Sequence, residues 1–291
     1  MGKSNVTNLS HSAFVGIGAY AAAICVSPVA IKRSSLPDAP WGLSEFSLDP
    51  ISSALVAILI TAFVAFLSCL VIARLSGIGT TIVTLAILVI VHSIFILRID
   101  IFKGKQTLFG IPQIFDLHTL IAVTVATVIA ARMFRESRWG IQLRASSDEE
   151  VGARAMSVNV YRLRLLAWVL GSVILAVAGI SYAFFLGTIS TQPPFFSHVF
   201  LTLAMLIFGG MRTVTGAALG TAIIAFGLGG IRTFETGPVV PGIQMPELLG
   251  PPGIALGIVM VPTMSLRPGG IMGNSEIEQL IPWMRQMMRR S

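Results

Sequence analysis

Long apolar runs separated by short polar stretches dominate the chain. A helix needs roughly 20 mostly apolar residues to cross about 30 Å of hydrocarbon. About eight runs approach that length: 13–31, 51–73, 78–97, 117–131, 165–186, 199–208, 214–231 and 248–265. The sixth and seventh are short and are separated by Gly209-Gly210-Met211-Arg212, so one of them is expected to be a partial or tilted helix. The pattern predicts an all-α, polytopic transmembrane bundle over 1–273, followed by a tail at 274–291.

The longest polar interruption is the segment 132–164, between the fourth and fifth predicted spans. Its arginines are Arg132, Arg135, Arg138, Arg144, Arg154, Arg162 and Arg164. Arginine close to a span resists translocation, so arginine-rich loops of this length stay in the cytoplasm. We therefore expect 132–164 to be a cytoplasmic loop.

A short helix is predicted inside this loop. Ser147 and Glu150 have the spacing of a capping box, with acidic residues in the first turn, where the helix dipole favours them. Glu150 and Arg154 are four residues apart, the spacing of a favourable surface pair. Val151, Ala155 and Met156 give a narrow apolar face. Two interpretations stay open, a solvated loop helix and a helix that docks in a groove on a cytoplasmic partner.

The candidate docking residues form one continuous stretch. They are Ser147, Asp148, Glu149, Glu150, Val151, Gly152, Ala153, Arg154, Ala155 and Met156.

Composition and charge agree with a membrane protein. Of the 291 residues, 54% are hydrophobic and only 11% are charged, whereas a soluble domain is usually about a quarter charged. The net charge of +7 does not indicate a nucleic-acid surface, because the basic residues flank apolar spans. Fourteen of the twenty Lys and Arg fall on the side of the arginine-rich loop, which predicts that both termini are cytoplasmic. The two cysteines, Cys25 and Cys69, lie in apolar segments, and no disulfide is predicted.

The predicted spans carry almost no ionisable chemistry. No Asp, Glu, Lys or Arg lies in a predicted span away from its ends. Proton-coupled carriers need intramembrane carboxylates, and intramembrane hydrolases need a nucleophile with a base, or a metal cluster. The pattern therefore predicts no catalytic residue, no metal site and no enzyme. If the protein transports a solute uphill, the energy must enter outside the spans, and the helix in the cytoplasmic loop is the candidate place. Polar and small residues inside spans are candidate pathway residues: Gly16, Gly18, Thr81, Thr84 and His92.

Several stretches resemble a known family, the permeases of branched-chain amino acid ABC transporters, and in particular their larger, LivM-like membrane subunit. The family's loop pattern is met by Arg144, by 148–150, by Ala153-Arg154-Ala155 and by Val158-Asn159-Val160. The segments 14–20, 77–85, 208–213 and 268–271 are similar to further motifs of the family. The resemblance covers roughly 9–273, and the loop motif is its most specific part.

The resemblance implies a multi-pass subunit of an ATP-driven importer in the bacterial inner membrane. Its partners would be ABC ATPase subunits, a second permease, a periplasmic substrate-binding protein and the lipid bilayer. The helix near 148–156 would be the coupling helix that contacts the ATPase. The chain has no Walker A motif, so ATP and magnesium would bind to the partner ATPases and no cofactor to this chain.

The chain departs from the family pattern at four places. Relatives usually carry one or two spans before the position of Leu9, which are expected to be missing here. Val89 stands where relatives often have glutamate, residues 102–107 replace a Thr-Gly-Gly-like stretch, and Ser157 stands where glycine is usual.

Two other functions stay open from the residues alone. An ion-coupled secondary carrier could bind sodium through backbone carbonyls at broken helices. A membrane scaffold that has lost transport is the second alternative.

Overall fold

The computed structural model describes residues 8–36, 40–75, 77–190, 195–210, 213–235 and 270. The chain divides into two compact units, Met1–Val199 and Phe200–Ser291, and each is described by itself. In the described part, four helices are long and apolar enough to cross a membrane: α3 (Pro50–Ile72), α4 (Ile78–Leu97), α6 (Leu117–Glu136) and α9 (Val160–Leu186). Two bent helix pairs raise the number to six if each pair is one span. The all-α membrane fold is confirmed; the predicted span 248–265 and the tail 274–291 lie outside the described residues.

The first predicted span, 13–31, is wrong as a single helix. The structure has α1 (His11–Val26) and α2 (Val29–Ser35), which meet at an angle of 115°. The helix breaks at Pro28. The proline ring disfavours a helical conformation of the residue before it, and proline has no backbone N–H to donate. α2 then carries Lys32, a lysine only 2% exposed.

Lys32 is buried among backbone carbonyls. Its ammonium donates to the carbonyl of Phe46 at 2.7 Å and to that of Cys25 at 3.5 Å, and it lies 5.0 Å from the ring centre of Phe46. The Cys25 carbonyl belongs to the last turn of α1, where the helix dipole favours a cation. Lys32 therefore joins the end of α1 to the chain that leads through the 3₁₀ turn Pro40–Gly42 to α3.

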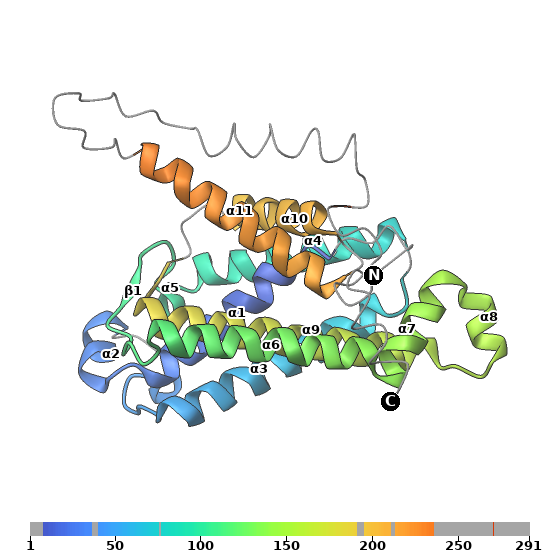
Figure 1. Cartoon of the computed structure of the whole chain (residues 1–291). Helices are drawn as coiled ribbons and strands as arrows, with labels where there is room; N and C mark the ends of the chain where they lie inside the picture. Colours follow the sequence, from blue (N-terminus) through green and yellow to red (C-terminus); the bar gives the residue numbers. More distant parts are fainter. Residues whose placement is uncertain are drawn as a thin grey trace. The chain divides into compact units, whose positions relative to one another are not determined.

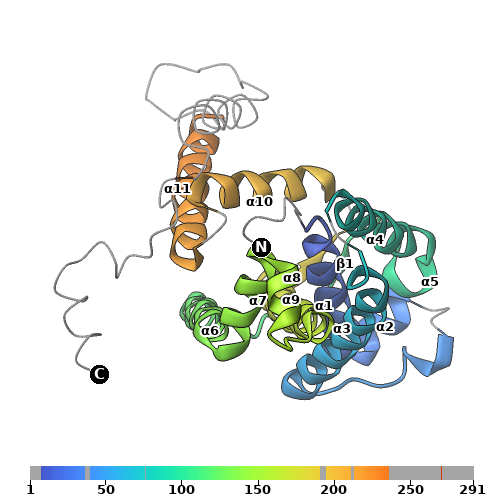
Figure 2. The same ribbon diagram turned by 90° about the vertical axis from the view of Figure 1, so that its right-hand side faces the viewer.

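The core of the first unit is formed by α1, α3 and α9, which run side by side (Figure 2). Small residues permit the close approach of α1 and α9. A Cβ atom on Gly18 would lie 2.7 Å from the Cα atom of Ala176, and one on Gly179 would clash with the carbonyl of Val15. On α3 the buried face is a row of small side chains at every fourth position, Ala57, Thr61, Ala65 and Cys69.

A tryptophan of α9 links all three core helices. Trp168 packs edge-to-face on Phe14 of α1, with ring centres 5.8 Å apart. Its indole nitrogen donates to the hydroxyl of Ser68 on α3 at 3.2 Å. Both cysteines, Cys25 and Cys69, are buried and free.

Outward faces of the long helices are strongly apolar. α3 exposes Leu55, Leu59 and Phe63, each more than half accessible, on the side away from its small-residue row. None of the residues of α6 is buried, although α6 is an apolar helix of 20 residues. Such faces suit contact with hydrocarbon rather than water.

The end of the unit opposite the arginine-rich loop is closed by aromatic rings and a short ribbon. Phe95 of α4 contacts Tyr20 of α1 and Phe102 of α5 (Ile99–Phe102), with ring centres 4.8 Å apart in both pairs. β1 (Leu108–Phe109) pairs antiparallel with β2 (Thr188–Ile189). This two-residue ribbon ties the connection after α5 to the end of α9.

The arginine-rich segment forms two helices at the other end of the unit (Figure 1). α6 continues as far as Glu136, and α7 (Arg138–Asp148) and α8 (Glu150–Ala155) follow before α9 begins. The sequence predicted only the second of these helices.

The second unit begins within α10 (Phe195–Gly209), which with α11 (Val214–Glu235) forms the other bent pair, with an angle of 120°. A Cβ atom on Gly220 would lie 2.5 Å from the Cα atom of Gly209. The predicted break between the sixth and seventh runs is thus a bend between two helices, and glycine is required at Gly209 and Gly220 by close backbone contact.

Candidate functional site

The predicted capping box at Ser147 is wrong. Ser147 lies inside the last turn of α7, whose N-cap is Ser137, the acceptor of a hydrogen bond from the backbone N–H of Gly140 at 3.3 Å. Glu149 has an extended conformation and separates α7 from α8, so Glu149 is the N-cap position of α8. The pattern misled because the helix-forming stretch that begins at Arg138 continues through the residues that would have been the cap.

The side chain of Glu150 joins α8 to α9. One carboxylate oxygen accepts from Arg154 at 2.5 Å, the pair predicted from the spacing of four residues. The other oxygen accepts from Arg164, in the first turns of α9, at 2.9 Å. Arg154 is largely exposed, whereas Glu150 and Arg164 are each about one-third exposed. The contact to Arg164 had no local signal in the sequence, because the two residues lie on different helices.

Backbone geometry explains the motif that connects α8 to α9. Ser157 has a φ of +59°, in the left-handed region. The N–H of Ser157 donates to the carbonyl of Arg154 at 3.0 Å, and that of Val158 to the carbonyl of Ala153 at 3.1 Å, an arrangement that ends a helix with a left-handed residue. Asn159 then caps α9 by accepting from the N–H of Arg162 at 3.1 Å. The glycine that is usual at the position of Ser157 in the family would adopt this φ without strain.

Apolar side chains on α8 and on the residue that follows it are accessible. Val151 and Met156 are 76% and 79% exposed, more than most side chains of the long helices. Gly152 adds no side chain to this surface. Five of the candidate docking residues are exposed, namely Glu149, Val151, Arg154, Ala155 and Met156, whereas Ser147, Glu150, Gly152 and Ala153 are partly buried. The side chain of Asp148 lies outside the described residues.

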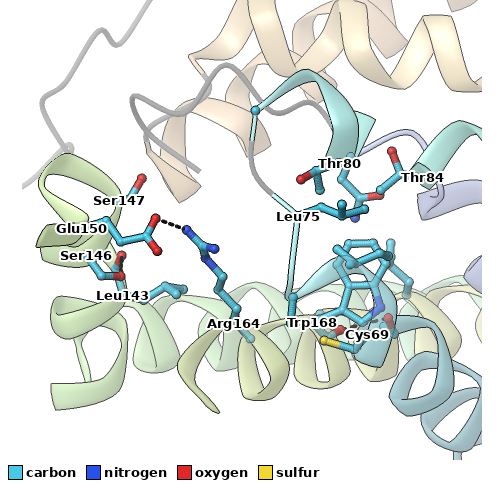
Figure 3. A pocket seen from close by; sticks show the side chains of 18 residues that line it. Cys69, Leu75, Thr80, Thr84, Leu143, Ser146, Ser147, Glu150, Arg164 and Trp168 are labelled. Carbon is cyan, nitrogen blue, oxygen red and sulfur yellow. Dashed lines mark hydrogen bonds and ion pairs between the residues drawn. The ribbon is translucent and has the colours of Figure 1, made fainter. Parts of the chain in front are cut away.

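A cavity of about 430 Å³ lies between this segment and the core helices (Figure 3). Its walls come from the end of α3, the start of α4, the end of α7, the start of α8 and the first half of α9. They comprise Asn8, Cys69, Ile72, Ala73, Leu75, Gly77, Thr80, Thr84, Leu143, Ser146, Ser147, Glu150, Arg164, Ala167, Trp168, Gly171, Ser172 and Leu175. We call it the α8–α9 cavity.

The candidate pathway residues do not form one group. Thr84 lines the α8–α9 cavity and donates to the carbonyl of Thr81 at 2.8 Å. A Cβ atom on Gly16 would touch the ring of Phe95, and Gly18 faces Ala176, so both glycines lie at helix contacts. His92 is half-buried in α4, two turns beyond Thr84. The roles of these five residues stay predictions.

The structure brings together segments that the charge pattern placed on one side of the membrane. Asn8, the turn after Arg74 and the helix α8 all border or flank the same cavity, at the end of the unit opposite the β1–β2 ribbon. The side of the membrane on which this end lies stays a prediction.

Comparison with known proteins identifies the family. The sequence model of one family, described as "Branched-chain amino acid transport system / permease component", matches residues 1–240. A protein of Methanocaldococcus jannaschii, named as a probable branched-chain amino acid transport permease protein LivH, is 27% identical over 172 residues, which are 57% of this chain and 50% of that protein. The chain thus spans about half the length of this relative. No solved structure matches.

The comparisons bear on the resemblance proposed from the sequence. The branched-chain permease family is confirmed over most of the chain. The finer assignment to the larger, LivM-like subunit stays a prediction, because the relative carries the name LivH. With a family match that covers residues 1–240 and a helical membrane architecture, the chain belongs to the family of branched-chain amino acid transport system permease components.

Proposed function

We propose that this chain is the membrane permease subunit of an ATP-driven importer for branched-chain or related small amino acids and amides. The observation that carries the proposal is the family match over residues 1–240. In this proposal the ATPase subunits bind and hydrolyse ATP, a second permease completes the pathway, and a periplasmic protein delivers the substrate. The chain lies in the bacterial inner membrane with both termini and the segment 132–164 in the cytoplasm.

The proposed contact with the ATPase is made by α8. A helix that docks in a groove needs an accessible apolar face, and Val151 and Met156 supply one at the end of the unit. The charges beside this face, Glu150 and Arg154, satisfy each other and leave the apolar side chains to make the contact. α8 has only six residues, so the surface is small and needs rigid support from behind.

Support for α8 comes from the ion pair to α9. The Glu150–Arg164 contact connects α8 directly to a helix of 27 residues in the core of the unit. When ATP closes the ATPase subunits, a displaced α8 would pull on the first turns of α9. Packed helices can move as rigid bodies, and in this proposal their movement opens the pathway alternately to the inside and to the outside of the membrane.

The test is co-purification and uptake with the partners encoded beside this chain. Val151→Glu combined with Met156→Glu places two carboxylates on the proposed contact and is expected to reduce recovery of the ATPase at least tenfold. Ile114→Glu is the matched control, because Ile114 is a partly exposed apolar residue at the opposite end of the unit. Equal ATPase recovery with the double variant and the wild type would reject α8 as the contact, and ATP-independent leucine uptake would reject the importer.

A further inference from the structure

The α8–α9 cavity has a charged end and a second end beside Trp168. At the charged end Arg164 extends toward Glu150, beside Ser146 and Ser147 (Figure 3). At the other end lie the indole of Trp168, the Cys69 thiol and the hydroxyls of Thr80 and Thr84 (Figure 3), while Ile72 and Leu175 add apolar lining to the cavity. A volume of about 430 Å³ is within the usual range for small-molecule sites, roughly 300–1,000 Å³.

The charged end keeps hydrogen-bonding capacity for a ligand. Arginine has five N–H donors in a planar group, and among the described residues Arg164 donates only to Glu150. The hydroxyl oxygen of Ser147 is buried without a hydrogen-bond partner in the described part of the chain. Buried polar atoms without partners are uncommon and destabilise the folded protein, so a polar ligand group that reached the Ser147 hydroxyl would remove that cost.

The two charges fit the two ends of a zwitterion. A carboxylate accepts well from a guanidinium, and an ammonium donates well to a carboxylate. Glu150 already accepts from Arg154 and Arg164, so a ligand's carboxylate is favoured beside Arg164, and its ammonium would share the Glu150 carboxylate with the two arginines. The end beside Trp168 would then cover an aliphatic side chain.

We propose that the α8–α9 cavity is a binding site for a small zwitterionic amino acid with an aliphatic side chain. The ligand's carboxylate would bind Arg164, its ammonium group Glu150 and the hydroxyls beside it, and its side chain the end beside Trp168. The bound amino acid would contact both helices that the Glu150–Arg164 pair joins. This site deepens the proposed function, on which it rests for the class of amino acid, by adding a site next to the ATPase-coupling helix.

A glycine in the wall permits a sharp test. Gly171 lines the cavity, and a Cβ atom there would meet nothing within 4 Å. Gly171→Leu therefore fills the cavity from α9 without a clash at its first side-chain atom, and leucine favours a helix more than glycine does. Gly79→Leu is the matched control: Gly79 is also helical, is also open at its Cβ position and does not line the cavity.

The measurement is equilibrium binding of radiolabelled L-leucine to the full chain in phosphatidylcholine nanodiscs, without ATPase subunits. We expect saturable binding to the wild type and to Gly79→Leu, and a Kd raised roughly tenfold or more in Gly171→Leu, equivalent to about 1.4 kcal/mol or more. Leucinamide, which lacks the carboxylate, is expected to compete at least about tenfold less well than leucine.

Three outcomes would overturn the site: no saturable binding to the wild type, equal Kd values for the wild type and Gly171→Leu, or displacement of leucine by phosphatidylglycerol in the nanodisc. The last outcome would assign the cavity to an anionic lipid headgroup. This assay needs no ATPase, so its failure is distinguishable from failure of the proposed importer, which shows as lost co-purification or ATP-independent uptake.

Discussion

The carboxylate of Glu150 and the guanidinium of Arg164 lie 2.9 Å apart and form a side-chain bridge from α8 to α9. Fourteen residues separate them in the sequence, and the chain between them includes the left-handed Ser157. Glu150 therefore contributes both to the surface helix, through Arg154, and to the core helix, through Arg164.

The first prediction concerns transport coupling through this bridge. Glu150→Gln is expected to reduce ATP-dependent leucine uptake several-fold while the protein remains in the membrane, because the amide holds two arginines less firmly than the carboxylate does. The stability effect should be small, about 0.2–1 kcal/mol, since both partners are partly exposed. Uptake in proteoliposomes, with ATP hydrolysis measured in parallel, tests this.

Glu45→Gln is the control for that prediction, because Glu45 is an exposed glutamate outside the candidate docking residues and makes no ion pair among the described residues. If the bridge matters, combining Glu150→Gln with Arg164→Gln should cost little more than either change alone. Additive losses, or full uptake by Glu150→Gln, would contradict the role assigned to the bridge.

The second prediction concerns the left-handed residue after α8. Ser157→Gly is expected to stabilise the protein by up to about 1 kcal/mol, because glycine adopts a positive φ without the strain that a Cβ atom causes. Ser157→Ala keeps the Cβ atom and should give no gain. Thermal unfolding in detergent measures both; a lower midpoint for Ser157→Gly than for Ser157→Ala would refute the backbone explanation.

The third prediction concerns the contact between α1 and α9. Gly18→Ala places a methyl group 2.7 Å from the backbone of Ala176 and is expected to destabilise the protein by about 1–3 kcal/mol. Gly79→Ala, at an open helical position, should be neutral or stabilising by up to about 1 kcal/mol. The folded fraction after graded heating, read by size-exclusion chromatography, distinguishes the two, and the same response from both variants would count against the close packing.

The fourth prediction concerns Lys32. Lys32→Met removes the donor to the carbonyls of Phe46 and Cys25 and should destabilise the protein by about 1–3 kcal/mol, the range for buried acceptors left without partners. Arg33→Met changes the same charge at an exposed neighbouring position and should have little effect. Thermal midpoints provide the comparison, and equal stability of the two variants would mean that water replaces the lysine.

The length of the apolar runs predicted the long helices well. The run 78–97 coincides with α4, and 51–73 differs from α3 by one residue at each end, because a span of uninterrupted apolar residues leaves few alternatives. Hydropathy could not predict the bend between α1 and α2, since both sides of Pro28 are apolar. It also missed α7, which is amphipathic and arginine-rich and therefore reads as a polar loop.

The candidate site was predictable only in its local parts. The pair of Glu150 and Arg154 follows from helical spacing, but the partner Arg164 depends on how α8 folds back on α9. Trp168 and Ser68 are 100 residues apart, and nothing in either neighbourhood indicates the other. Cavity walls drawn from five helices require tertiary packing that a single sequence does not encode in any local pattern.

The antiparallel ribbon and the Glu150 bridge fasten α9 at opposite ends. A helix of 27 residues is about 40 Å long, and a rigid helix transmits a tilt at one end along its whole length. A tilt of about 5° about one end displaces the other by about 3.5 Å, more than half a helical turn. A small displacement of α9 at Arg164 would therefore give a larger displacement near Ile189. The amplification depends on the length of a rigid helix and not on flexibility.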